Sequence, residues 1–279
     1  MSTRTAAAAI AAVVFVFGTA ACNSDRAYAP PDTVLTDQQV SKDVAVSGGE
    51  AMATDLASLA NSASLIGGSF SVQSEPTSLR FDVQSTADSC VYGSGRWTCA
   101  PRTEGGLTVS RSYAFYDAAG QPTKMKDALT TASINFQLEI NGVVNRDTVF
   151  SGVVHRTRNV TISGLLGVET TRRWDGVGIS ADTNTHRTAL TTRTYAGKSV
   201  DSLKAIIYPQ PRTPTGYPLS GSMVRIVKYL VTSTGHGTER RTVDRRIVVT
   251  YNGTSSAQVQ AGSVTCTLHL DTHHVDGCS

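Results

Sequence analysis

The residues best suited to hold a metal ion lie close together near the C-terminus. His269, Asp271, His273 and His274 fall within 269–274, and imidazole and carboxylate groups are ligands for zinc or copper. Their order in the chain argues against a site. His269 and Asp271 alternate with two leucines, which places them on the solvent face of a strand, and the other two fall in the turn that follows. We therefore expect these four residues to hold no metal, and we expect no other cofactor.

Sequence motifs of the common enzyme classes are absent from the chain. G-x-S-x-G, G-x-x-x-x-G-K-[ST], G-x-G-x-x-G and H-E-x-x-H do not occur. The sequence therefore gives no signal for a nucleophile elbow, a nucleotide-binding loop or a zinc peptidase. A Ser–His–Asp triad can be built from residues in any order along the chain, so a hydrolase stays an alternative. We predict a protein that is not an enzyme.

Four of the five cysteines fall into two local pairs. Cys90 and Cys99 bracket the tight-turn pair Ser94-Gly95, which suits a two-residue hairpin. Cys266 and Cys278 are centred on Thr272, in a polar turn at 271–274. Four cysteines permit three pairings, and this symmetry favours the two local ones, each closing its own hairpin. A zinc site is the rival interpretation, but no C-x-x-C spacing occurs. Each disulfide should contribute about 2–3 kcal/mol.

Arginines concentrate in the second half of the chain. If neighbouring strands align them, they could bind anionic headgroups or polysaccharide. We favour solvated faces instead, because Glu239 and Asp244 interleave with them and long cations protect exposed strands from aggregation. The arginines of this second half are Arg156, Arg158, Arg172, Arg173, Arg225, Arg240, Arg241, Arg245 and Arg246.

The two tryptophans, Trp97 and Trp174, are expected to be packed.

The first 22 residues have the pattern of an export signal. Arg4 is followed by an apolar run over 5–18, then by Thr-Ala-Ala-Cys at 19–22. This resembles the signal peptide and lipobox of bacterial lipoproteins, although Thr19 stands where that family usually has Leu. The resemblance implies removal of residues 1–21, lipidation of Cys22, and a location in the bacterial cell envelope. The chain would be held by the lipid bilayer on the extracytoplasmic side, with the outer membrane as the expected membrane.

The alternative at this N-terminus is ordinary secretory cleavage after Ala21, since small residues precede it. The odd number of cysteines favours lipidation, because four cysteines can pair once Cys22 carries lipid. The apolar run is too short to span a bilayer, which takes about 20 residues.

Composition points to an extracytoplasmic β-protein. Charged residues make up 17% of the chain and the net charge is +3, so the balance predicts no nucleic-acid partner. The chain is rich in Thr, which suits the exposed faces of antiparallel strands.

Patterning divides the chain into a tether, a helix and many strands. Residues 22–46 are polar and contain Pro30-Pro31, so we predict a flexible tether there. Ser47 and Glu50 form a capping box, and the apolar spacing that follows predicts one helix over 48–62. About ten strands follow. Asn141-Gly142 and Asn252-Gly253 are predicted hairpin turns, 208–219 is a predicted loop, and 185–195 a predicted edge strand.

These signals predict an all-β fold, an antiparallel meander with one N-terminal helix. A barrel or a curved half-barrel, with the helix over its open side, suits this order better than a sandwich. The domains would be the signal peptide 1–21, the lipidated tether 22–46 and one β-rich domain 47–279.

The folded part resembles uncharacterised β-rich envelope lipoproteins in phrases such as Y-P-L-S-G at 217–221 and V-T-Y-N-G-T at 249–254. That resemblance implies no activity and no binding residue. We expect a non-enzymatic, membrane-tethered domain that scaffolds or docks against an envelope protein. A carrier of an apolar ligand is the first alternative and a hydrolase the second.

Overall fold

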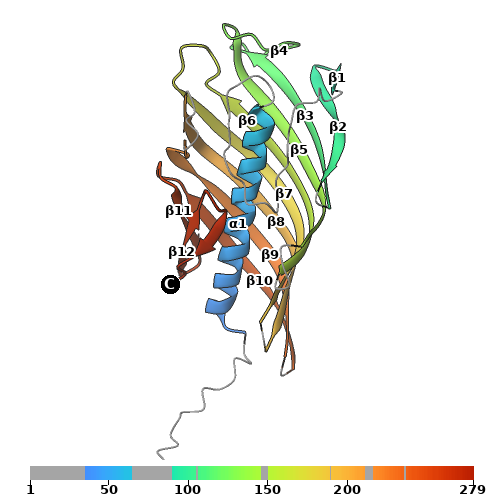
Figure 1. Ribbon diagram of the computed structural model, residues 1–279, viewed down its shortest axis with the longest axis vertical. Helices are drawn as coiled ribbons and strands as arrows, with labels where there is room; N and C mark the ends of the chain where they lie inside the picture. The colour runs from blue at the N-terminus through green and yellow to red at the C-terminus, as the bar shows by residue number, and fades with distance from the viewer. Residues whose placement is uncertain are drawn as a thin grey trace, which may run out of the picture. The chain divides into compact units, whose positions relative to one another are not determined.

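The computed structural model describes residues 35–64, 90–104, 106–145, 150–188, 190–210, 216–235 and 237–279. Within them, one helix, α1 (Asp37–Ser64), accompanies one 13-stranded antiparallel sheet. Both belong to a single compact unit, Val34–Ser279. Figure 1 shows the sheet curving around α1.

The strands follow one another across the sheet in chain order, as a meander. The order is β1-β2-β3-β5-β6-β7-β8-β9-β10-β11-β12-β13, and the short β4 pairs with β3 beside this path. The bounds are β1 Cys90–Gly93, β2 Arg96–Glu104, β3 Leu107–Asp117, β4 Pro122–Thr123, β5 Thr131–Asn145, β6 Phe150–Ser163, β7 Thr171–Arg187, β8 Thr192–Pro209, β9 Ser220–Thr234, β10 Thr238–Thr250, β11 Ser256–Ala261, β12 Val264–His269 and β13 His274–Asp276.

The all-β prediction is confirmed, and the sheet is open. β1 and β13 end the strand order and do not pair with each other, so the curved half-barrel is correct and the closed barrel is not. The central strands carry alternating buried and exposed residues, as in β9. That period of two gives the sheet an inner face toward α1 and an outer face toward solvent.

The helix is longer than the sequence predicts, because its true start was missed. Thr36 Oγ1 accepts from Gln39 N at 3.1 Å and Gln39 Oε1 accepts from Thr36 N at 3.3 Å. This is a capping box at 36–39, so the box predicted at Ser47 and Glu50 is wrong. Ser47 Oγ donates to Asp43 O one turn back, within the helix. Residues 37–46, predicted as tether, are helical. The side chains of Val40 and Val44 are buried, so this first part of the helix belongs to the folded domain.

Two glycines in the middle of α1 allow its close approach to the sheet. A Cβ at Gly48 would collide with Ile247 Cδ1 of β10, and one at Gly49 would lie 2.9 Å from Val275 Cγ2 of β13. Glycine lowers helix stability by about 1 kcal/mol relative to alanine, so packing must compensate. α1 therefore packs on the β10–β13 end of the sheet, and its Met52, Leu56 and Leu59 join the core.

Three local predictions are wrong. β5 continues through Asn141-Gly142 to Asn145, with Gly142 paired to both β3 and β6, and position 142 needs glycine because the backbone of 106–107 lies too close for any Cβ. Residues 185–195 lie in and between β7 and β8, which are central strands and not an edge. β8 also extends to Pro209, which shortens the predicted loop. Asn252-Gly253 does lie between two paired strands, in the loop 251–255 that joins β10 to β11, with Gly253 at φ 84°.

Candidate functional site

A cluster of six charged side chains lies buried between α1 and the sheet. Three are carboxylates and three are guanidinium groups, so the formal charge of the cluster is zero. Its members come from α1 and four neighbouring strands: Asp55 of α1, Arg156 and Arg158 of β6, Asp182 of β7, Asp201 of β8 and Arg225 of β9.

Asp55 is the helix's contribution, and all three arginines contact its carboxylate. Arg158 donates to Oδ2 from Nε at 3.1 Å and also from Nη2. Arg156 Nη1 donates to Oδ1 at 3.2 Å, and Arg225 Nη2 donates to Oδ2 at 3.3 Å. Asp55 is 0% exposed. The carboxylate therefore connects two strands of the sheet to the helix.

The two strand carboxylates complete the pairing of the arginines. Asp201 accepts from Arg225 Nε at 2.6 Å, and its Oδ2 lies 2.8 Å from Arg158 Nη2. Asp182 Oδ1 lies 3.3 Å from Arg156 Nε. The Ser180 hydroxyl donates to Asp201 Oδ2 at 3.2 Å and accepts from Arg158 Nη2 at 3.1 Å.

The register of the sheet brings these groups together. Arg158, Gly178, Asp201 and Arg225 lie opposite one another on β6, β7, β8 and β9. Gly178 leaves the space that the guanidinium needs, since a Cβ there would lie 2.6 Å from Arg158 Nη1. Directly opposed side chains on one face of a sheet are close neighbours. The ion network is thus built into the strand pairing.

The charges hold one another ionised in spite of burial. Burial by itself raises the pKa of Asp55, but the positive charges of Arg158, Arg156 and Arg225 outweigh it and lower the pKa to about 2. Burial lowers the pKa of Arg225, but the charges of Asp201 and Asp55 outweigh burial, so the net shift of its pKa is upward. The six groups pair with one another, and their pairing holds α1 against the sheet. We call these six residues the clamp.

Sequence reasoning missed this clamp, although a signal was present. Arg156 and Arg158 were expected on solvated faces, yet they share the phase of the buried Val154 and Val160 on β6. The prediction is wrong for these two and for Arg225, because a carboxylate from α1 compensates their charge. Asp55 likewise falls among Met52, Leu56 and Leu59, the apolar stripe of the helix.

The remaining arginines divide between exposed and half-buried positions. Arg173, Arg240 and Arg246 are on exposed or nearly exposed faces as predicted, and Arg173 pairs with Asp175 at 2.5 Å. Arg172, Arg241 and Arg245 are half-buried, and the last two contact Asp37 in the first turn of α1. These two meet the helix N-terminus at an exposed carboxylate, a contact that the sequence did not suggest.

A second link joins α1 to the sheet. Asp43 accepts from Arg193 Nε at 2.7 Å and from the Tyr195 hydroxyl at 2.5 Å, both on β8. Burial and the Asp43 charge raise the pKa of Tyr195 well above its ordinary value. Burial also lowers the pKa of the neighbouring His186, whose ring lies edge-on to Tyr195.

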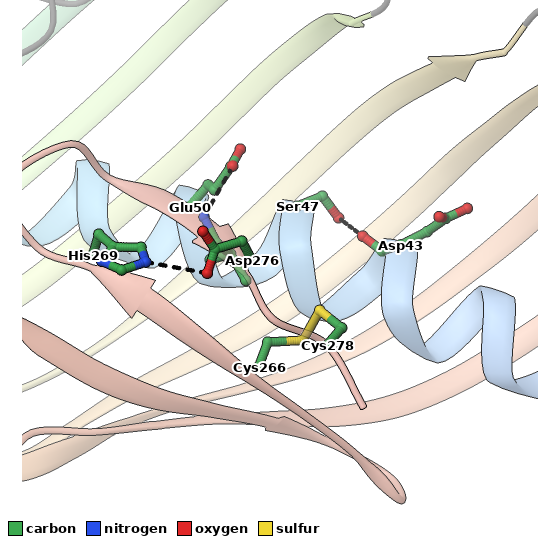
Figure 2. The surroundings of a disulfide bond; sticks show 8 residues. Asp43, Ser47, Glu50, Cys266, His269, Asp276 and Cys278 are labelled. Atoms are coloured by element: carbon green, nitrogen blue, oxygen red, sulfur yellow. Dashed lines mark hydrogen bonds and ion pairs between the residues drawn. A yellow bond between two sulfur atoms is a disulfide. The ribbon is translucent and has the colours of Figure 1, made fainter.

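The C-terminal histidines pair with carboxylates at separate points. His269 Nε2 lies 3.1 Å from Asp276 Oδ1, as Figure 2 shows, and His274 Nδ1 lies 3.1 Å from Glu50 Oε1 of α1. Asp271 accepts from its neighbour Thr272 N, and His273 lies in the turn with φ 54. In the described ranges, no three His, Cys, Asp or Glu side chains gather to hold a metal.

Both local disulfides are present. Cys90 lies opposite Cys99 across a hairpin whose turn is Ser94-Gly95, with φ values of 51° and 76°. Cys266 bonds Cys278 (Figure 2), and the hairpin register shifts at Gly277, whose φ is 62°. This one-residue shift, which the backbone pairing of Thr265 with Ser279 records, brings the two cysteines opposite each other. The lipidation candidate Cys22 and the signal peptide lie outside the described residues.

The two tryptophans are packed, as expected. Trp174 is fully buried beside Tyr208. Trp97 is half-buried, stacks on Tyr113, and its Nε1 donates to Lys124 O at 2.9 Å.

The outer face of the sheet carries an apolar row that the sequence analysis did not identify. Ile179, Val200 and Ile226 lie directly opposite one another on β7, β8 and β9, and each is more than half exposed. Val177 lies two residues from Ile179 on the same face and is 57% exposed. Three of these residues line a groove of about 720 Å³ that extends across the outer face to Pro101 of β2. We call these four residues the outer apolar row.

No helix in the described part of the chain combines the length and the apolar character that crossing a bilayer requires. Comparisons of the chain with models of protein families, with curated proteins and with solved structures found no match.

Proposed function

We propose that this chain is a lipid-anchored protein of the bacterial envelope whose β-domain docks against another envelope protein and catalyses no reaction. The N-terminal pattern supports the anchor. Four of the five cysteines are joined in two disulfides, so Cys22 is the cysteine left for lipid. Lipidation with more than one chain gives stable membrane attachment, since each buried methylene contributes about 0.8 kcal/mol.

The outer apolar row is the observation that carries the docking role. Three aligned, half-exposed aliphatic side chains on adjacent strands form a continuous patch, and such patches mark interaction surfaces. Lys198 and Lys228 lie opposite each other beside Val200 and Ile226. Like charges in this position repel each other. A partner that presents apolar side chains flanked by carboxylates would complement both features.

The inner side of the sheet supports docking over transport of an apolar ligand. α1 and the inner face share one core of buried side chains, and the ion network ties the two together. An apolar carrier would need that space for its ligand. Carrier function remains the second candidate because of the groove beside Val177, whose volume of about 720 Å³ lies in the range of small-molecule sites, about 300–1,000 Å³.

Site-specific photo-crosslinking in native membranes tests the proposal. A photoreactive residue at Val200 should give a discrete protein adduct, and one at Asn135, on the polar side of the same face, should not. The contact peptide of the partner should contain apolar and acidic residues. Reversing Lys198 and Lys228 to Glu should abolish the adduct. A small-molecule or lipid adduct at Val200 would favour the carrier, and an adduct equal at both positions would contradict a docking face.

A further inference from the structure

One half of β10 is a free sheet edge in the described residues. β10 pairs with β9 along its whole length, Thr238–Thr250. On its other side, β11 pairs with residues 247–250 only. The described residues therefore leave 238–246 without a second neighbouring strand. An edge of this length is a template for another strand.

The backbone of this edge faces outward in a defined pattern. The β9–β10 register ends with Thr250 opposite Ser222, and in the next pair along, Tyr251 N donates to Gly221 O at 3.1 Å. Odd-numbered residues of β10 therefore direct their backbone groups toward β9, and even-numbered residues direct theirs toward the edge, because the two alternate along an antiparallel pair. Arg245 Nη1 already reaches one such carbonyl, Asp244 O, at 2.9 Å.

We infer that this edge pairs with the same edge of a second copy of the chain, antiparallel and with Thr242 on the two-fold axis. In that register, Arg240 lies opposite Asp244 of the other copy and Glu239 opposite its Arg245. Even-numbered residues oppose even-numbered ones, so the outward-facing amides and carbonyls of both copies meet. Two-fold symmetry makes the Arg240–Asp244 pair occur twice.

The charge pattern selects this register against its neighbours. A shift that places Thr242 opposite Arg240 brings the two copies of Arg241 together on the axis. The opposite shift pairs Arg240 with Arg246 and Arg241 with Arg245. Like charges directly opposed across strands are destabilising. The register centred on Thr242 opposes no like charges over 238–246.

The side chains available for pairing lie on the outer face. Arg240, Thr242, Asp244 and Arg246 are exposed. Arg240 and Asp244 have no ion-pair partner within the described ranges, although Lys228 lies opposite Asp244 on β9. On the inner face, α1 already engages the odd-numbered side chains: Glu239 accepts from Leu35 N, and Arg245 contacts Asp37 and Ser41. The outer Arg240–Asp244 pair is therefore the specific contribution of a second copy.

Charge reversal and rescue test the dimer in the purified full-length protein. Sedimentation or native mass spectrometry should find a dimer in the wild type. Asp244→Arg places arginine opposite Arg240 and should weaken dimerisation at least tenfold, and Arg240→Asp should do the same. The double variant, Arg240→Asp with Asp244→Arg, restores opposite charges and should restore the dimer. Lys204→Glu, an exposed reversal on β8, is the matched control and should change nothing.

Crosslinking tests the register independently. Opposed residues in a hydrogen-bonded antiparallel pair have Cα atoms about 5.5 Å apart, within disulfide reach. Thr242→Cys should therefore give a disulfide-linked dimer, and Arg240→Cys should not. A monomeric wild type, a failure of the double variant to rescue, or equal crosslinking at 240 and 242 would overturn the inference. None of these outcomes depends on the Val200 adduct, so the docking role can fail or hold separately.

Discussion

Asp55 is a buried carboxylate held by three arginines, and removing its charge should leave positive charge uncompensated in the core. We expect Asp55→Asn to lower the free energy of unfolding by about 3–5 kcal/mol, the usual cost of breaking a buried pair from one side. Asp37→Asn is the control, because Asp37 is exposed and exposed pairs contribute little. Urea denaturation of both variants measures the effect. Equal, small losses would show that the cluster does not clamp the helix.

The same carboxylate should make stability depend on pH in the acid range. The pKa of Asp55 is lowered from 3.8 to about 2 in the folded protein, so the folded state resists protonation where the unfolded chain accepts it. The contribution is fully present above pH 3.8 and is lost as the pH falls through about 2. It amounts to about 2 kcal/mol, at about 1.4 kcal/mol per pKa unit.

This pH dependence is measured by unfolding the wild type and Asp55→Asn between about pH 5 and about pH 2. The difference in stability between them should shrink as the pH falls. A difference that stays constant over that range would mean that Asp55 does not titrate with the shifted pKa.

At the scale of the elements, α1 is attached through an apolar stripe as well as through charges. Leu56 and Leu59 are both buried. Truncating both to alanine should cost several kcal/mol, since a buried Leu→Ala change costs about 2–5 kcal/mol. The thermal midpoint should fall and binding of a hydrophobic dye should rise. Gln38→Ala, at an exposed position of the same helix, should do neither. An unchanged midpoint in the double variant would contradict this packing.

The two hairpin disulfides give a further prediction. Non-reducing peptide mapping should recover Cys90 with Cys99 and Cys266 with Cys278, and no crossed pairs. Replacing one pair by serines should lower the free energy of unfolding by about 2–3 kcal/mol, because each bond restricts a short loop of the unfolded chain. A free thiol at any of these four cysteines in native protein would contradict the hairpin registers.

The elements were predictable where the signal is local. Alternation along β9 and the Ser94-Gly95 turn each depend on neighbouring residues, so the strands and the first hairpin could be predicted. The start of α1 was missed because Pro30-Pro31 and several aspartates gave 22–46 the composition of a linker. Only contact with the sheet explains why Val40 and Val44 are buried. The Asn141-Gly142 error has the same origin, since the close backbone at 106–107 is a non-local contact.

The candidate site was less predictable because it is assembled from distant parts. Asp55 and Arg225 are 170 residues apart in the chain. Arginines with no carboxylate close to them in the sequence are expected on a solvated face. Knowing that a carboxylate would come from the helix stripe requires knowing which strands the helix covers. The phase of Arg156 and Arg158 was the one signal available in the sequence.

At the scale of the whole molecule, a filled inner face leaves the outer face and the β10 edge for interaction. The ion network is neutral and enclosed, so it fixes the position of α1 and offers little to a ligand. The outer apolar row and the β10 edge lie on or beside the same outer face, because β9, which carries Ile226 of the row, is the direct neighbour of β10. Dimerisation at the edge would therefore place two outer apolar rows side by side in one continuous sheet, a larger docking surface than one copy provides.

Attachment to the membrane is the last prediction, and it concerns the chain as a whole. If Cys22 carries the lipid, Cys22→Ser should release the protein from carbonate-washed membranes into the soluble extracytoplasmic fraction. Because the clamp, the core and both disulfides lie within 35–279, the released protein should keep the wild-type thermal midpoint. Ser24→Ala is the matched control and should stay membrane-bound. Mass spectrometry of the N-terminal peptide should find acyl chains on Cys22. A Cys22→Ser variant that stays as firmly bound as the wild type would mean that something other than this cysteine holds the protein to the membrane.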